Sequence, residues 1–391
     1  MTSAPSQGCG PVAVLVPAWT VVEWLWGSGP MLRALQQAGW SVIVMNTGQA
    51  EPAAVQGASL AAIPLCHCPL RSMWDWSTLL QLLRRLREHS VAMIVSVGPK
   101  LTAGGLVLRV MEKQRHRPFL VAMEACPTGT GLSDWLLCRA LRSVDRILLP
   151  TRESGQAYRR LGVPADRLSW LAPPVETFQP PPVPIAPLPP LPATACVLTH
   201  VSTSEDDKGA RAAIITHEIL RYHRPHLHLL VAAYSPAQAH RLRDFAQRLA
   251  FDDPRIHIVS AEQVNPAWFI DRVVLVTAMA HSVSVALAAM YQGGVIAGWD
   301  TPELRGLVSD GVHGWLVPAG NTTELAERVR RLIDHPQQRL LLAEAARQQA
   351  RQWSRTRFQQ QFARLFQDLQ SSRQPQDYPS IRSLATMSPP R

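Results

Sequence analysis

The sequence has few cysteines for its length, and their spacing forms no disulfide framework. Six cysteines are spread over 391 residues, and a chain of this size buries enough apolar surface to fold without disulfide bonds. Cys66-His67-Cys68 groups three metal-ligating residue types, but no second ligand pair follows at the spacing of a zinc site. We therefore expect neither a disulfide-stabilised domain nor a bound metal.

Long apolar runs are also missing. No segment reaches the roughly 20 apolar residues that a membrane-spanning helix needs. The N-terminus, MTSAPSQGCG, lacks the basic segment of a secretory signal peptide, and the short apolar run from Val12 to Ala18 fits a first β-strand. The sequence predicts a cytoplasmic protein and leaves peripheral membrane contact open.

Acidic residues are fewer than basic ones. The chain has 39 Lys and Arg against 29 Asp and Glu, which gives a formal net charge of +10. This excess fits phosphorylated ligands, a lipid surface or nucleic acid, although dispersed solubilising charge explains it without any partner. No recognised nucleic-acid-binding module is present, and aromatic residues do not alternate with the basic clusters, so we expect no nucleic-acid partner.

What the chain does contain is a regular alternation of apolar runs and amphipathic segments. This alternation predicts an α/β fold made of two Rossmann-like, doubly wound domains with parallel sheets. Expected strands cover residues 11–19, 41–47, 91–98, 119–125, 145–150, 196–203, 227–235, 256–261, 273–279 and 294–299. Expected helices cover residues 31–40, 77–89, 101–114, 131–142, 209–222, 236–250, 284–291, 322–334, 337–351 and 354–370.

A proline-dense segment, QPPPVPIAPLPPLPATA, divides the chain at residues 179–195. Closely spaced prolines cannot hold a helix or a central strand, so we expect an extended, semi-rigid linker. The predicted boundaries are a first domain at residues 1–178, a second at 196–353, and a final helix at 354–370. The polar, proline-rich tail at 371–391 is expected to be disordered.

Three segments follow a pattern that occurs together in one enzyme family. They are ILLPTRESGQAYRRLGVPADRLSWLAPPVETFQP at residues 147–180, VSTSEDDKGARAAI at 201–214, and the strand-loop-helix-strand segment at 271–318, which ends in DGVHGWLVP. Together they resemble the group 1 (family 4-like) retaining glycosyltransferases of the GT-B fold. The resemblance covers most of the chain but is specific only in the second half. It implies a nucleotide-sugar-side second domain, an acceptor-side first domain, and a last helix, 354–370, that crosses back onto the first domain.

The resemblance also implies a cationic pair from a G-R-x4-K-G loop. Such a pair stabilises the charge that develops on the departing nucleoside diphosphate. In this sequence Thr203 stands at the arginine position and Lys208 at the lysine position. Lys208 is therefore the first catalytic candidate. The alternative is that it is an ordinary exposed lysine at a helix start.

Two glutamates, spaced E-x7-E, are implied as well, but Ala280 and Ala288 occupy their positions. Losing an acceptor for buried ribose hydroxyls costs about 1.5–3 kcal/mol per charged hydrogen bond. His281, Ser282 and Ser284 lie at the start of the expected helix, where hydroxyls and free N–H groups bind anions. The alternative is that the serines only cap the helix and that His281 is a solvated loop residue.

Further candidates come from the same resemblance. Gly27-Ser28-Gly29 matches the family's glycine loop near the donor phosphates, although a tight turn explains it equally well. Glu124 stands near the place of a polar cleft residue and is the second catalytic candidate, unless it pairs with an arginine. Glu303 keeps the family's x-P-E turn, or only stabilises a helix N-terminus.

The basic amphipathic helix at 77–89, together with Trp74 and Trp76, forms a candidate membrane-interface patch. Packing of this helix on a sheet explains its leucines without a membrane.

Three functions fit the sequence. The first is a divergent, retaining, metal-independent hexosyltransferase that moves a sugar from a nucleotide-sugar to an unknown glycan or lipid-linked acceptor, with no further cofactor. The second is an inactive pseudo-glycosyltransferase kept as a binding or assembly scaffold. The third, another GT-B enzyme such as a sugar-nucleotide epimerase, matches the segment after residue 271 less well. Since Thr203, Ala280 and Ala288 are all uncharged, the pattern favours the fold more than it favours activity.

Overall fold

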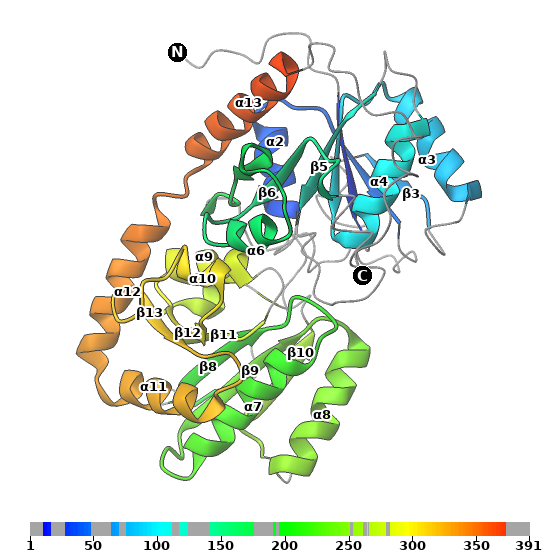
Figure 1. Ribbon diagram of the computed structural model, residues 1–391. Helices are drawn as coiled ribbons and strands as arrows, with labels where there is room; N and C mark the ends of the chain where they lie inside the picture. The colour runs from blue at the N-terminus through cyan, green and yellow to red at the C-terminus, as the bar shows by residue number, and fades with distance from the viewer. Residues whose placement is uncertain are drawn as a thin grey trace, which may run out of the picture.

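Two parallel β-sheets, each flanked by helices, make up the molecule (Figure 1). The computed structural model describes residues 11–16, 28–47, 64–69, 76–111, 117–123, 141–175, 191–192, 195–250, 253–260, 264, 266–278 and 282–372. The predicted α/β class with two doubly wound sheets is confirmed.

The first sheet has seven parallel strands in the order β3-β2-β1-β4-β5-β6-β7. The order reverses between β1 and β4, because the chain first builds outward to one side and then to the other. The strands are β1 (Val12–Val16), β2 (Val42–Asn46), β3 (Leu65–His67), β4 (Met93–Val97), β5 (Phe119–Met123), β6 (Arg146–Leu149) and β7 (Leu168–Trp170). The helices described around it are α2 (Gly29–Gln37), α3 (Trp76–Glu88), α4 (Pro99–Met111) and α6 (Gly155–Arg160).

The second sheet repeats this plan with six parallel strands in the order β10-β9-β8-β11-β12-β13. Its reversal lies between β8 and β11. The strands are β8 (Cys196–Val201), β9 (Leu227–Ala233), β10 (Ile256–Ser260), β11 (Val273–Val276), β12 (Val295–Trp299) and β13 (Gly314–Val317). The helices are α7 (Lys208–Arg221), α8 (Pro236–Ala250), α9 (Ser282–Gln292), α10 (Pro302–Arg305), α11 (Thr322–Asp334), α12 (Pro336–Ala350) and α13 (Arg355–Ser371).

Helix α13 lies against the first sheet's helix α2, although it follows the second sheet in the chain (Figure 1). Trp40 meets Phe362 and Phe366 edge to face, with ring centroids 5.2 and 4.9 Å apart. Val175, just after the first sheet, donates its N–H to the carbonyl of Trp353 over 2.9 Å. As a result, one face of each sheet belongs to a single buried apolar cluster.

The structure adds strands that the sequence pattern did not predict. β3 and β13 have only three and four residues, too few to produce a recognisable alternation. Residues 131–140 of the expected helix 131–142 lie outside the described residues, as do most of the linker and the tail after residue 372, so the domain boundaries stay predictions. Within the described ranges, no helix combines the length and apolar character needed to cross a membrane.

Candidate functional site

The reversal of strand order marks where a doubly wound sheet binds ligands, at the carboxyl ends of the strands. In the second sheet, the segments leaving this point are residues 202–207, after β8, and the residues that connect β11 to α9. Thr203 lies on the first of these segments, and Lys208 and Ser282 begin the helices that follow them. These three sequence-predicted donor residues therefore gather on one edge of the second sheet.

The carboxyl edges of the two sheets face each other. Gly306, after α10, lies so close to Thr151 and Glu153, after β6, that a Cβ at this position would overlap both side chains. Figure 1 shows the same arrangement, with α6 of the first half above α9 and α10 of the second. Glycine is needed at 306 because only hydrogen leaves room for this approach.

The loop before Lys208 is held by the first turns of α8. Gln238 is fully buried, and its amide nitrogen donates to the carbonyls of Ser204 and Asp206 over 3.0 and 3.3 Å. Its amide oxygen accepts from Tyr234 N over 2.7 Å. Asp206 Oδ1 accepts from Lys208 N over 3.1 Å, which fixes the start of α7. The loop is thus rigidly positioned by polar contacts.

Arg241 pairs with two acidic neighbours of Lys208, one of which, Asp207, also lies 3.3 Å from Arg211. It forms a bidentate contact with Asp207, with both distances 3.0 Å, and reaches Glu205 Oε2 over 3.0 Å. The hydrogen bonds from Arg241 lower the pKa of Asp207, and those to Asp207 and Glu205 raise the pKa of Arg241. Lys208 itself is exposed, and its ammonium pairs with none of the described residues. It remains available to an anion.

A buried histidine joins the two strands beneath this loop. His200 Nδ1 donates to the carbonyl of Leu275 over 3.0 Å and lies 3.2 Å from Thr277 Oγ1, which donates to Gly209 O over 2.9 Å. Burial lowers the pKa of His200 to about 4, so the ring is neutral at pH 7. A Cβ on Gly209 would lie 2.7 Å from Thr277 O. This close contact sets the start of α7 directly on the end of β11.

Helix α9 is buried on all sides over residues 282–290. Ser282 and Ser284 are 2% and 6% exposed, and neither hydroxyl hydrogen-bonds to a described residue. Ala288 is fully buried within the apolar cluster. The position at which the resemblance implies a ribose-binding glutamate is therefore part of the core here.

Other predicted residues lie on the facing edges or beyond the described chain. Glu303 is half-buried in the first turn of α10, whose Thr301 hydroxyl caps Leu304 N. Ser28 and Gly29 are buried at the start of α2. Gly27, Glu124, Ala280 and His281 lie outside the described residues.

Sequence reasoning missed His200, Thr277, Gln238 and Arg241. The only signal for His200 was a polar residue inside the apolar run CVLTHV, next to the candidate loop. Gln238 and Arg241 gave no signal, because they lie about thirty residues from the loop that they hold.

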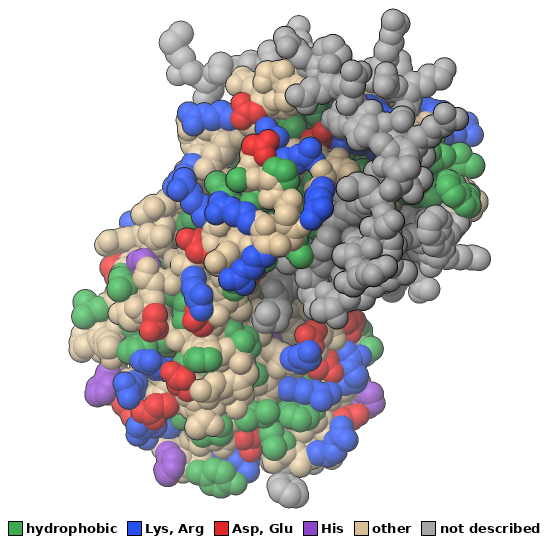
Figure 2. Space-filling view, in the orientation of Figure 1, with side chains coloured by type: hydrophobic (Ala, Val, Ile, Leu, Met, Phe, Trp, Pro, Cys, Tyr) green, Lys and Arg blue, Asp and Glu red, His purple; other side chains and the backbone are tan. Residues whose placement is uncertain are grey.

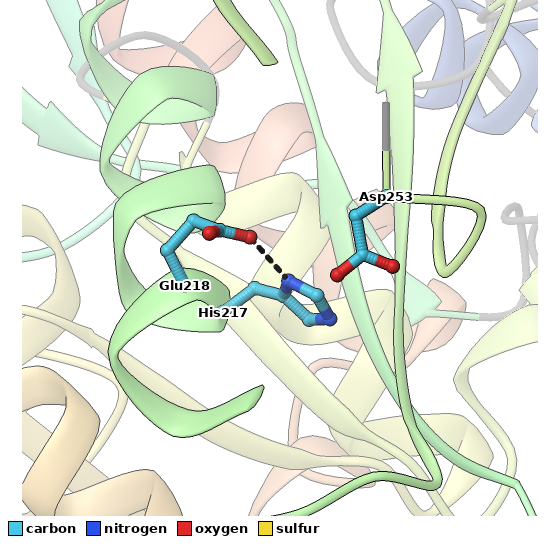
Figure 3. Close-up of side chains that lie close together, drawn as sticks. All are labelled: His217, Glu218 and Asp253. Atoms are coloured by element: carbon cyan, nitrogen blue, oxygen red, sulfur yellow. Dashed lines mark ion pairs between the residues drawn. The ribbon is translucent and has the colours of Figure 1, made fainter. Parts of the chain in front are cut away.

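One group of potential metal ligands occurs in the described part of the chain. His217, Glu218 and Asp253 have ligand atoms within 4.8 Å of one another (Figure 3). Arg221 lies 2.8 Å from Glu218 and 3.2 Å from Asp253, and Arg255 lies 2.6 Å from Asp253. Two guanidinium groups already balance the two carboxylates, and a divalent cation would be repelled by both. We interpret the cluster as an ionic network that ties α7 to the start of β10.

Figure 2 shows basic and acidic side chains interspersed over the second half of the molecule. On this face, the second half therefore offers no broad basic surface for a polyanion.

Neither a protein-family model nor a curated protein matches the sequence. Solved structures share the architecture. Sucrose-phosphate synthase from Thermosynechococcus elongatus has a TM-score of 0.70 at 15% identity, over 93% of this chain and 100% of that one. HepE from Anabaena, in complex with UDP-glucose, has a TM-score of 0.73 at 15% identity, over 92% and 99%. UDP-GlcNAc 2-epimerase from Neisseria meningitidis, bound to UDP-GlcNAc, has 0.63 at 14% identity, over 92% and 100%.

At these identities the similarity concerns the fold. It extends over both sheets and the helices that follow them, and it includes transferases and an epimerase. The chain therefore has the GT-B fold.

Proposed function

We propose that the protein is a retaining, metal-independent glycosyltransferase that binds a nucleotide-sugar between its two halves, with the donor on the second. The observation that carries the proposal is Lys208, a cation at the start of α7, beside the reversal of strand order, whose ammonium pairs with no residue that the structure describes. HepE, which has the same fold, was solved with UDP-glucose, so we take a uridine donor as the first to test.

In this proposal, Lys208 places its ammonium against the donor diphosphate. Charge grows on the leaving diphosphate as the sugar departs, so a fixed cation stabilises the transition state more than the ground state. The buried N-terminus of α9, with Ser282 and Ser284, supplies N–H and hydroxyl donors beside it. Thr203 replaces the family's second cation by a neutral group, which lowers the expected affinity and rate.

The test is calorimetric titration with UDP-, GDP- and ADP-sugars, followed by assays of sugar transfer and donor hydrolysis. Lys208→Ala should weaken donor binding about 10- to 100-fold, because one charged hydrogen bond contributes about 1.5–3 kcal/mol. Arg248→Ala is the matched control, since Arg248 is an exposed cation on α8 whose side chain donates to the carbonyl of Asp244 in the same helix. If wild-type protein binds no donor at millimolar concentration, the proposal is wrong.

A second candidate, a pseudo-glycosyltransferase, is favoured by one observation. Ala288, at the position where the family resemblance implies a ribose-binding glutamate, is buried among apolar side chains. A scaffold protein would bind the donor or a partner without turnover. Transfer or hydrolysis that disappears in Lys208→Ala would exclude this candidate, whereas donor binding without any turnover would support it.

For the acceptor we propose a glycan or a lipid-linked sugar that approaches from the first half. Helix α3 exposes Trp76 and Leu80, each 53% accessible, beside the exposed Arg84. A helix surface with exposed apolar side chains beside a cation is suited to the interface of an anionic bilayer. Sedimentation with phosphatidylglycerol vesicles should fall when Trp76 and Leu80 are changed to serine, and unchanged sedimentation would refute the contact.

A further inference from the structure

A cavity of about 400 Å³ lies at the opposite end of the second sheet, where the strands begin. Its walls are the end of the linker at Leu191 and Pro192, the start of β8 at Cys196, the turn at Arg272 before β11, and Arg339 on α12. The six residues of β8 separate it from the Lys208 loop by about 20 Å. It is therefore distinct from the candidate donor site.

Arg272 is an unusual cation for this position. Its side chain pairs with no described residue, and its Nη1 atom is enclosed by protein without a hydrogen-bond partner. Burial alone lowers the pKa of Arg272. A desolvated guanidinium that lacks a hydrogen-bond partner lowers the stability of the folded protein. The stability of the fold therefore does not explain why an arginine stands at this position.

A second guanidinium faces the same space. Arg339 is half-buried, and among the described residues its side chain hydrogen-bonds only to the thiol of Cys196, a weak partner. Asp271 also lines the cavity, but it is exposed and forms no ion pair with a described residue. Two cations and one carboxylate leave the cavity with a net positive charge.

We propose that this cavity binds a small phosphorylated anion, held between Arg272 and Arg339 at the junction of linker and second sheet. Planar guanidinium forks match the oxygen spacing of a phosphoryl group and bind it through paired N–H donors. The volume lies in the range of small-molecule sites. An anion in this position would neutralise the charge of Arg272 and would contact both the linker and the second half.

Two measurements locate the binding. The Tm of thermal unfolding is measured at increasing concentrations of inorganic phosphate and, separately, of phenyl phosphate. The comparison distinguishes the free ion from a phosphate ester. Alkylation of Cys196, read by mass spectrometry of its own peptide, reports occupancy of this cavity alone. We expect both ligands to raise the Tm of the wild-type protein and to slow the alkylation of Cys196. The ligand that binds more tightly identifies the class of the natural ligand, a free phosphate ion or a phosphate ester.

The variants separate this site from the donor site. Arg272→Gln should fold with a Tm no lower than wild type in the absence of phosphate, and should bind phosphate at least about tenfold more weakly. Arg339→Gln should show the same loss, and Arg330→Gln, an exposed arginine on α11, should behave as wild type. Lys208→Ala should keep the full phosphate response.

Three results would overturn the proposal. The first is a wild-type protein whose Tm and Cys196 alkylation do not respond to either ligand. The second is an equal response in Arg272→Gln and Arg339→Gln. The third is a response that disappears in Lys208→Ala, because the phosphate would then occupy the donor edge instead.

Discussion

Changing His200 to asparagine should remove a defined part of the pH dependence of stability. His200 is 1% exposed, and its Nδ1–H donates to the carbonyl of Leu275. An asparagine amide nitrogen can take the place of that donor but does not titrate. The substitution therefore removes the ionisable group and keeps the main hydrogen bond.

The magnitude follows from the pKa values. Burial lowers the pKa of His200 from 6.5 to about 4 in the folded protein. The unfolded chain binds the proton more readily between these values, so stability is complete above pH 6.5 and is lost as pH falls toward 4. Between pH 7 and pH 5, His200 accounts for a loss of about 2 kcal/mol in the free energy of unfolding.

The assay is urea unfolding at pH 7 and pH 5, followed by circular dichroism. In His200→Asn, the loss of stability between the two pH values should be about 2 kcal/mol smaller than in wild type. His217, whose pKa burial also lowers to about 4, stays in place and keeps its own contribution. His240→Asn, at an exposed position, is the control and should follow wild type. An identical pH dependence in His200→Asn would show that the ring is not buried in the neutral form.

Three further substitutions test how the site is assembled. Gly306→Val should force the facing edges apart and weaken donor binding in calorimetry while leaving far-ultraviolet circular dichroism unchanged; tight binding would contradict the contact. Arg241→Ala should remove the described cationic partner of Glu205 and one of the two partners of Asp207, and so lower donor affinity more at low salt than at high salt; equal effects at both salt concentrations would argue against electrostatics. Phe366→Ala should cost about 3–5 kcal/mol of stability in denaturant unfolding by removing a buried ring, and a cost below 1 kcal/mol would mean that α13 is only loosely attached.

The sequence predicted the fold well because both halves repeat a strong local signal. Buried parallel strands appear as continuous apolar runs, as in VVLV at residues 273–276, and the intervening helices carry amphipathic spacing. The bounds of helix 322–334 were predicted to the residue, but its cap was not: the sequence favoured Thr322 or Thr323, and the structure has Asn321, whose side chain accepts from Glu324 N. The short edge strands β3 and β13 were not predicted, because three or four residues are too few to show a recognisable hydrophobic pattern.

The candidate site was only partly predictable. The position of Lys208 could be foreseen because it depends on a strand, a loop and a helix that are consecutive in the chain. The contacts of Gln238 and Arg241 could not, because they depend on how α8 is rotated against the loop. The same holds for Gly306, whose importance appears only when the two halves meet.

Because α13 packs against the first half, the first half cannot complete its folding until α13 has been synthesised. The first sheet is synthesised before the second, yet the aromatic surface around Trp40 is covered by Phe362 and Phe366, which follow the whole second sheet in the chain. Until α13 has been synthesised, the first half exposes an apolar surface that is prone to aggregation. A polypeptide cut short before residue 358 would keep that surface permanently uncovered and depend on chaperones to stay out of aggregates.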